Sequence, residues 1–150
     1  MPHQYSLTTS LRQARETAMG FLRPAFTQYG LTEQKWHIIY VLAHRRSVDF
    51  HELASLTCIL RPSLTGILIR MDREGFIHRL KPMNDQRKLC IVLTQKGMDC
   101  YEQVKGLVEE GYKEIEDAFT SDKLIQLLNL LNEFTSIRSN RQDDLEEKTI

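Results

Sequence analysis

Apolar residues recur every three or four positions along most of the chain, and this spacing predicts a mainly helical protein. A first helix is expected over residues 6–29, where Pro24 should bend it and Gly30 should end it in a left-handed turn. A second helix should begin after Thr32, a typical N-cap residue. The apolar positions of the first helix are Leu7, Leu11, Ala14, Ala18, Leu22, Ala25 and Tyr29, and those of the second are Trp36, Ile39, Tyr40 and Ala43.

Two shorter helices follow, and their spacing predicts a helix-turn-helix motif. Asp49 and Glu52 have the spacing of a capping box at the start of one helix. Pro62 suits the first turn of the next helix, which Gly75 should end. Two short helices joined by about three residues are typical of DNA-binding proteins, in which the second is the recognition helix. The buried side of this helix should consist of Leu64, Ile67, Leu68 and Met71.

The opposite side of the expected recognition helix carries small polar residues and arginines. Hydroxyl groups and a glycine allow a close approach to base edges, while arginines can contact bases or phosphates. A solvated helix face has the same composition, so the pattern alone leaves both interpretations open. The residues on this side are Ser63, Thr65, Gly66, Arg70 and Arg73.

The next segment predicts a β-hairpin. Residues 76–82 and 88–94 are strand-like, and the polar stretch between them suits a turn. A hairpin directly after a recognition helix is a wing, whose tip can enter the minor groove of DNA. The negative potential of a narrow groove would attract Arg87 at this tip. Asp85 would repel phosphate, so we expect it to pair with Arg87 and to fix the direction of its guanidinium.

From Thr94 onward the pattern becomes helical again. One helix is expected through residue 119, and a strongly apolar helix follows as far as Ile137. These helices carry more apolar surface than a small winged domain needs, which favours a symmetric dimer. A monomeric helical cap over the core is the alternative. Residues 140–150 form an acidic tail that we expect to fray.

Composition and charge are those of a water-soluble protein, with one uneven feature. The chain has 150 residues, of which 41% are hydrophobic and 27% charged, and no apolar run approaches the length of a membrane span. The N-terminus has no apolar signal core, so we expect a cytoplasmic protein. The net charge of zero combines +2 over residues 1–60, +5 over residues 61–97 and −7 over residues 98–150. A basic middle next to an acidic C-terminal third suggests a surface for an anionic partner.

Motifs of enzyme chemistry are missing from the sequence. It contains no glycine-rich phosphate loop, no G-x-S-x-G, no H-E-x-x-H and no paired carboxylates, so neither an enzyme nor a cofactor site is predicted. The cysteines Cys58, Cys90 and Cys100 lack the spacing of metal ligands. They are expected to be reduced thiols.

The order of these elements resembles the MarR family. The resemblance spans about residues 6–139 and is carried best by PSLTGILIRMDREGFI and RLKPMNDQRKLCIVLTQKG, which include a wing with D-x-R and an LT-x-x-G helix start. It implies a single MarR-like domain over residues 1–150, mainly α with a small β-hairpin wing. The winged helix-turn-helix would occupy about 31–94, and residues 6–29 and 95–139 would form the helical dimerisation region.

The resemblance also implies a function. Members of the family are homodimers that bind a palindromic operator in double-stranded DNA as transcriptional repressors. By position, the residues implied in DNA binding are Arg61, Pro62, Ser63, Thr65, Gly66, Arg70, Asp85, Arg87 and Lys88. Gly66 stands where many relatives have a larger polar or basic residue, so the wing is expected to carry more of the discrimination between DNA sequences. A redox or metal sensor on this fold, and a helical protein-interaction module without DNA contact, stay open as alternatives.

Similarity to regulators of aromatic-acid catabolism implies an effector that releases the DNA. The implied effector is a phenolic acid such as 3,4-dihydroxyphenylacetate or 4-hydroxyphenylacetate, bound where the winged domain meets the dimerisation helices. Arg15 interrupts an apolar ridge and can pair with a carboxylate, or else form a salt bridge with Glu16, Glu52 or the other subunit. The complete set of candidate ligand residues is Arg15, Met19, Trp36, His37 and Tyr40.

Overall fold

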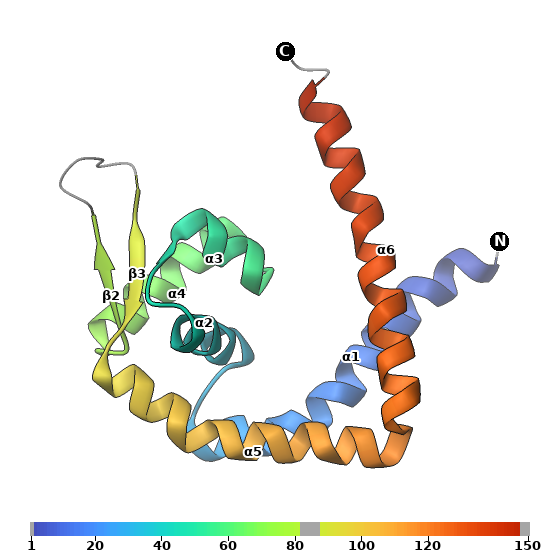
Figure 1. Ribbon diagram of the computed structural model, residues 1–150, viewed down its shortest axis with the longest axis horizontal. Coiled ribbons are helices and arrows are strands. Elements are labelled where there is room, and N and C mark those ends of the chain that lie inside the picture. The colour runs from blue at the N-terminus through green and yellow to red at the C-terminus, as the bar shows by residue number, and fades with distance from the viewer. Residues whose placement is uncertain (1, 82–87, 148–150) are drawn as a thin grey trace. The chain divides into compact units, whose positions relative to one another are not determined.

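The computed structural model describes residues 2–81 and 88–147, with side chains over 6–81 and 88–137. The chain forms two compact units, Met1–Glu110 and Gly111–Ile150, and each is described by itself. The helices are α1 (Pro2–Tyr29), α2 (Glu33–His44), α3 (Phe50–Thr57), α4 (Arg61–Arg73), α5 (Gln95–Phe119) and α6 (Ser121–Glu147), and the strands are β1 (Val48–Asp49), β2 (Ile77–Leu80) and β3 (Cys90–Leu93) (Figure 1).

The sequence predicted the end of α1 and the N-caps of α2 and α3, but α1 begins at Pro2 rather than at residue 6. Helix α1 continues through Pro24 to Tyr29, and Gly30 follows it with a φ of 63°. Thr32 caps α2, because its Oγ1 accepts the N–H of Lys35 at 3.1 Å. At α3, Asp49 Oδ1 accepts the N–H of Glu52 at 2.8 Å, which confirms the predicted N-cap.

Helices α3 and α4 form the predicted helix-turn-helix motif. Cys58 takes a left-handed conformation with a φ of 55°, and the two helices meet at an angle of 108°. This angle is typical of the motif. Helix α4 starts with Arg61 and Pro62 and stops before Gly75, whose φ is 84°.

The sheet contains a strand that the sequence did not reveal. Strand β3 pairs with β2 in the predicted hairpin and, on its other edge, with β1, so the strand order is β1-β3-β2. Both pairings are antiparallel, with Ile77 opposite Leu93 and Val48 opposite Ile91. A strand of two residues is too short to show an alternating pattern, which explains why β1 was not predicted.

One hydrophobic core joins the helix-turn-helix to the sheet. The stripe predicted for α4 is buried, and Phe26 of α1 lies 6.3 Å from Trp36 of α2 between ring centroids. These contacts tie the N-terminal helix α1 to α2. Residues that are almost completely buried in this core include Ile38, Ile39, Leu53, Leu64, Leu68, Met71, Ile77, Ile91 and Val104.

The second unit, residues 111–150, is helical and exposes apolar side chains. Helix α6 continues to Glu147, so it includes most of the segment expected to be a separate tail. Its exposed apolar residues are Ile125, Leu127, Leu128, Leu130, Phe134 and Ile137. Over residues 2–81 and 88–147, no single helix is long and apolar enough to cross a membrane; α3 and α4 reach that length and hydropathy only as a bent pair.

Candidate nucleic-acid interface and ligand site

One side of α4 packs in the core, and the opposite side carries the residues implied in DNA binding. The exposed residues include Arg61, Pro62, Ser63, Thr65, Gly66 and Arg70, all predicted as DNA contacts. Thr65 Oγ1 donates to the carbonyl of Arg61 at 3.0 Å. The lone pairs of this hydroxyl therefore remain available as acceptors.

A shallow hollow of about 570 Å³ lies along this exposed side of α4. Gln34 of α2 contributes to its wall, and the rest of the wall comes from α4. Within the described residues, neither Arg70 nor Arg73 makes an ion pair. Space around Gly66 is open, because a Cβ at this position would meet no atom within 4 Å. The surface is therefore cationic, and it carries no side chain at Gly66.

The wing is fixed to the recognition helix by an ion pair. Arg79 Nε of β2 donates to Asp72 Oδ2 of α4 at 2.8 Å, and Figure 1 shows the hairpin beside α4. Lys88 is exposed two residues before β3 begins. Asp85 and Arg87, the predicted contacts at the tip, lie outside the described residues.

A second, smaller hollow lies between the wing and the helix-turn-helix. Its volume is about 290 Å³, and Thr65 and Lys88 face it together with the start of α3. The N–H of Phe50 donates to the carbonyl of Leu89 at 3.0 Å, which joins α3 to the base of the wing. Hydrogen bonds and an ion pair thus connect the wing to α3 and α4, so the polar groups of α4 and of the wing belong to one connected structure.

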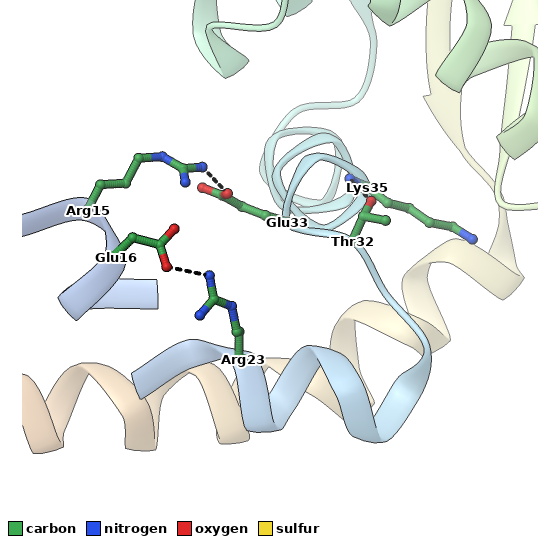
Figure 2. A network of polar contacts seen from close by, with 6 residues as sticks. All are labelled: Arg15, Glu16, Arg23, Thr32, Glu33 and Lys35. Atoms are coloured by element: carbon green, nitrogen blue, oxygen red, sulfur yellow. Dashed lines mark hydrogen bonds and ion pairs between the residues drawn. The ribbon is translucent and has the colours of Figure 1, made fainter. Parts of the chain in front are cut away.

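Arg15, the predicted carboxylate contact, pairs with an acid that the sequence did not indicate. Its Nη2 contacts Glu33 Oε2 in the first turn of α2, as Figure 2 shows. The two acids of the same chain that were proposed as partners, Glu16 and Glu52, are engaged elsewhere. Glu16 accepts from Arg23 at 2.8 Å, and this hydrogen bond lowers the pKa of the Glu16 carboxyl. Glu52 pairs with Arg45.

The other candidate ligand residues differ in accessibility. Trp36 is 4% exposed and Met19 is also buried, whereas Tyr40 is 49% exposed and His37 is half-buried. The rings of Trp36 and Tyr40 lie 6.3 Å apart between centroids. Tyr40 and His37 therefore offer more surface to a ligand than Trp36 or Met19.

Two aromatic residues outside the predicted set complete this cluster. Tyr101 of α5 stacks on Trp36 with ring centroids 5.7 Å apart and planes at 13°. Its hydroxyl lies 3.3 Å from His44 Nε2, while His44 Nδ1 lies 2.8 Å from the carbonyl of Tyr40. A neutral His44 then carries its proton on Nδ1 and accepts from Tyr101. Burial raises the pKa of Tyr101, which keeps its hydroxyl protonated as a donor.

The aromatic rings of the cluster come from α2 and α5. The helical spacing of Tyr101 predicts that it lies on the apolar side of its helix. No local sequence motif predicts its contact with Trp36. The helix α5 that carries Tyr101 is expected to contribute to dimerisation, and the aromatic cluster joins that helix to α2.

A junction of four residues connects α2, the end of α4 and the start of α5. Lys35 Nζ lies 2.6 Å from Glu74 Oε2 and 4.1 Å from the centroid of Phe76. On the same ring, Lys96 Nζ lies 4.6 Å from the centroid, and it donates to the carbonyl of Glu74 at 2.6 Å. The hydrogen bond from Lys35 lowers the pKa of Glu74, which keeps this carboxylate ionised.

The cysteines and acids show no arrangement for a metal. Over the described residues, no group of three or more His, Cys, Asp or Glu side chains could hold an ion. Cys58, Cys90 and Cys100 are all free thiols, and only Cys58 is exposed. Burial raises the pKa of Cys100, so this thiol is less readily ionised than an exposed one.

Comparison with known proteins agrees with this arrangement. Residues 31–89 match the MarR family. The chain is 52% identical over 140 residues to the homoprotocatechuate degradative operon repressor of Escherichia coli, covering 93% of this chain and 95% of that one. It is 44% identical to the HTH-type transcriptional regulator FarR of Neisseria gonorrhoeae, covering 88% and 90%.

Similarity to solved structures extends over most of the fold. The crystal structure of NadR in complex with 4-hydroxyphenylacetate matches with a TM-score of 0.74 and 44% identity, covering 86% of this chain and 92% of that one. Identity at this level over nearly the whole length of its relatives, together with the helix-turn-helix and wing, shows that the chain belongs to the MarR family of winged helix-turn-helix transcription regulators.

Proposed function

We propose that this protein is a transcriptional repressor that binds operator DNA as a homodimer and releases it when a phenolic acid binds. The exposed side of α4 is the observation that carries the DNA-binding part. Arg70 and Arg73 make no ion pair within the described residues, and the helix surface at Gly66 is open. An exposed, unpaired guanidinium is ready to contact a phosphate or a guanine edge.

A symmetric dimer would present two copies of α4 and two wings. Two recognition helices related by a two-fold axis bind two half-sites of opposite direction, so the operator is expected to be palindromic. Apolar side chains on α6 supply a surface for the second copy. The wing residues Arg87 and Lys88 would contact DNA beside each major-groove site, and Asp85 would fix the direction of the Arg87 guanidinium.

Two relatives support a phenolic acid as the effector. One is named as a repressor of homoprotocatechuate degradation, and another was solved with 4-hydroxyphenylacetate. In this chain the effector's carboxylate would pair with Arg15, and its ring would lie against the cluster formed by Met19, Trp36, His37 and Tyr40. Glu33 already occupies one side of the Arg15 guanidinium. A guanidinium has five N–H donors, so it can accept a second carboxylate or exchange the first.

Release of DNA would follow from linkage between the two sites. One form of the dimer would have its recognition helices at the wrong spacing for the operator. If the effector binds this form more tightly than the operator-bound form, it lowers the affinity for DNA. DNA then lowers the affinity for the effector by the same factor. A coupling of about 1 to 3 kcal/mol is typical and corresponds to about 5- to 150-fold in affinity. Such a change is sufficient for derepression.

The experiment that tests the function is a titration of phenolic acids into a complex of the protein with the DNA upstream of its gene. Fluorescence anisotropy of labelled DNA should fall when 4-hydroxyphenylacetate or 3,4-dihydroxyphenylacetate is added, and benzene-ring analogues without a carboxylate should have little effect. A protein that does not bind this DNA at low salt, or a complex that no phenolic acid dissociates, would contradict the corresponding half of the proposal.

Variants of α1 test the effector site within the same assay. Arg15→Ala should bind DNA like the unchanged protein but should require much more effector for release, because the pair with the carboxylate is lost. Arg12→Ala removes an exposed cation from the same helix and serves as the matched control. If Arg15→Ala releases DNA at the same effector concentration as the unchanged protein, Arg15 has only the structural role of pairing with Glu33.

A further inference from the structure

Ile69 is an apolar residue at the centre of the exposed side of α4. Its side chain is 39% exposed. With 3.6 residues per turn, Pro62, Gly66, Ile69 and Arg73 form a row along the helix, directly opposite the buried stripe that begins at Leu64. The side of the recognition helix that points furthest from the core therefore carries a β-branched aliphatic side chain.

Nothing in the fold requires isoleucine at this position. The core of α4 is formed by Leu64, Ile67, Leu68 and Met71, and Ile69 is not among its buried residues. Helix propensity does not favour it either, because β-branched residues lose side-chain freedom in a helix. A single exposed apolar residue is common on protein surfaces, so the surroundings of Ile69 decide what it can do.

The surroundings of Ile69 are suited to nucleic acid. It lines the hollow of about 570 Å³ together with Arg70, Arg73 and Ser63. One turn before it, Gly66 leaves the helix surface open. The arginines can reach phosphates, which would hold a DNA strand against this surface, while an aliphatic side chain gains nothing from a phosphate.

We propose that Ile69 contacts the C5-methyl group of a thymine in the major groove of the operator. This inference rests on the proposed DNA-binding function and adds a specificity-determining residue to it. The thymine methyl group is the apolar feature that distinguishes base pairs in the major groove, and apolar side chains recognise it. Ile69 lies about 10 Å along the helix from Pro62, so in a helix that follows the groove it meets a different base pair from the first turn.

Replacement of thymine by deoxyuridine tests this contact, because it removes only the methyl group. The probe is a set of duplexes of the operator region, each with one thymine replaced by deoxyuridine. For the unchanged protein, one position in each half-site should bind about fourfold more weakly, as expected for one methyl group that is no longer buried. Replacement of a thymine that the recognition helix does not contact should leave the affinity for the duplex unchanged.

Variants of Ile69 assign the effect to this side chain. Ile69→Ser should bind the thymine and deoxyuridine duplexes equally at that position, whereas Ile69→Val keeps methyl groups and should retain most of the difference. Thermal unfolding and dimer mass should match the unchanged protein in both variants, since the side chain packs outside the core.

Two results would overturn the proposal. They are a scan in which no thymine is sensitive, or a sensitive thymine whose effect persists in Ile69→Ser. Failure of the unchanged protein to bind any duplex would instead refute the proposed function, and this inference with it.

Discussion

Gly97 lies where α5 begins, and its lack of a side chain has a physical reason. A Cβ at this position would overlap the carbonyl oxygen of Phe76 and the side chain of Leu93. Thr94 holds the same corner, because its Oγ1 accepts the N–H of Gly97 at 3.1 Å and donates to the carbonyl of Gly75 at 2.6 Å. The LT-x-x-G motif thus marks a helix start pressed against the end of the recognition helix.

Substitution of Gly97 should therefore destabilise the protein. Gly97→Ala forces a shift of backbone or of Leu93 and should lower the free energy of unfolding by about 1 to 3 kcal/mol, measured by chemical denaturation at fixed protein concentration. Gly106→Ala is the matched control in the same helix, where a Cβ meets nothing within 4 Å. It should raise stability by about 0.5 to 1 kcal/mol. Equal effects of the two substitutions would show that the corner is not tightly packed.

Arg87 is the residue on which the predicted role of the wing depends. Arg87→Ala should weaken operator binding by about 1 to 3 kcal/mol, a magnitude typical of one specific side-chain contact to a base. Thermal stability and dimer mass should stay unchanged. Arg87→Lys keeps the charge but not the planar guanidinium, so it should restore binding only in part. Operator affinity that is the same in all three proteins would remove the wing from the proposed interface.

Individual residues of the site were predictable where a local motif defined them. The position of the Ser63 to Arg70 face on α4 follows from helical periodicity, which the structure confirms. The partner of Arg15 did not follow, because Glu33 is 18 residues away on another helix. Tyr101 is further still from Trp36 in the chain. Contacts between helices depend on how the helices pack, and single-sequence patterns carry little information about packing.

At the scale of elements, the Lys35–Glu74–Phe76–Lys96 junction connects α2, the end of α4 and the start of α5. Lys35 is only 17% exposed, while Glu74 is 48% exposed. A double-mutant cycle with Lys35→Met and Glu74→Gln should give a coupling of up to about 1 kcal/mol, as measured for partly exposed ion pairs. Lys105→Met with Glu102→Gln is the control, since that pair lies within α5 and joins no two elements.

The pH dependence of this coupling has a definite sign. The folded pKa of Glu74 lies below its ordinary value of 4.5. Its contribution is therefore complete above about pH 4.5 and disappears as the pH falls through the lowered pKa. The stability difference between the unchanged protein and Glu74→Gln should shrink over that acidic range. A difference that is constant from pH 7 to pH 3 would contradict the ion pair.

The elements themselves were mostly predictable, and the reasons are local. Thr32, Asp49 and Pro62 each start a helix through a side chain or ring that acts within one turn. Apolar periodicity then predicts most of the length of the longer helices. Strand β1 and the continuation of α6 to Glu147 were not predicted, because a two-residue strand has no period and an acidic segment has no apolar stripe.

At the scale of the whole molecule, charge and apolar surface are separated along the chain. Residues 61–97, with the recognition helix and wing, carry a net charge of +5, and residues 98–150 carry −7. A polyanion is therefore attracted to the winged part and repelled by the C-terminal helices. The C-terminal helices are instead rich in exposed apolar residues, which suits contact with a second copy of the chain.

Disruption of this apolar surface should abolish dimerisation and, with it, tight DNA binding. Leu127 and Leu128 are adjacent exposed residues on α6. The double variant Leu127→Glu/Leu128→Glu places two unpaired carboxylates in the expected interface and should convert the dimer to a monomer, measured by light scattering or sedimentation. A monomer contacts one half-site, so the affinity gained from linking two sites, typically about 10²- to 10⁴-fold, would be lost.

Asn129→Glu adds a carboxylate on the polar side of the same helix and controls for charge alone, so it should remain dimeric and bind the operator with nearly unchanged affinity. A variant with both leucines replaced that still sediments as a dimer would place the contact between copies elsewhere. A monomer that binds the operator as tightly as the unchanged protein would instead separate dimerisation from DNA binding. Together, mass and affinity therefore test whether two recognition helices must act as one unit on a palindromic site.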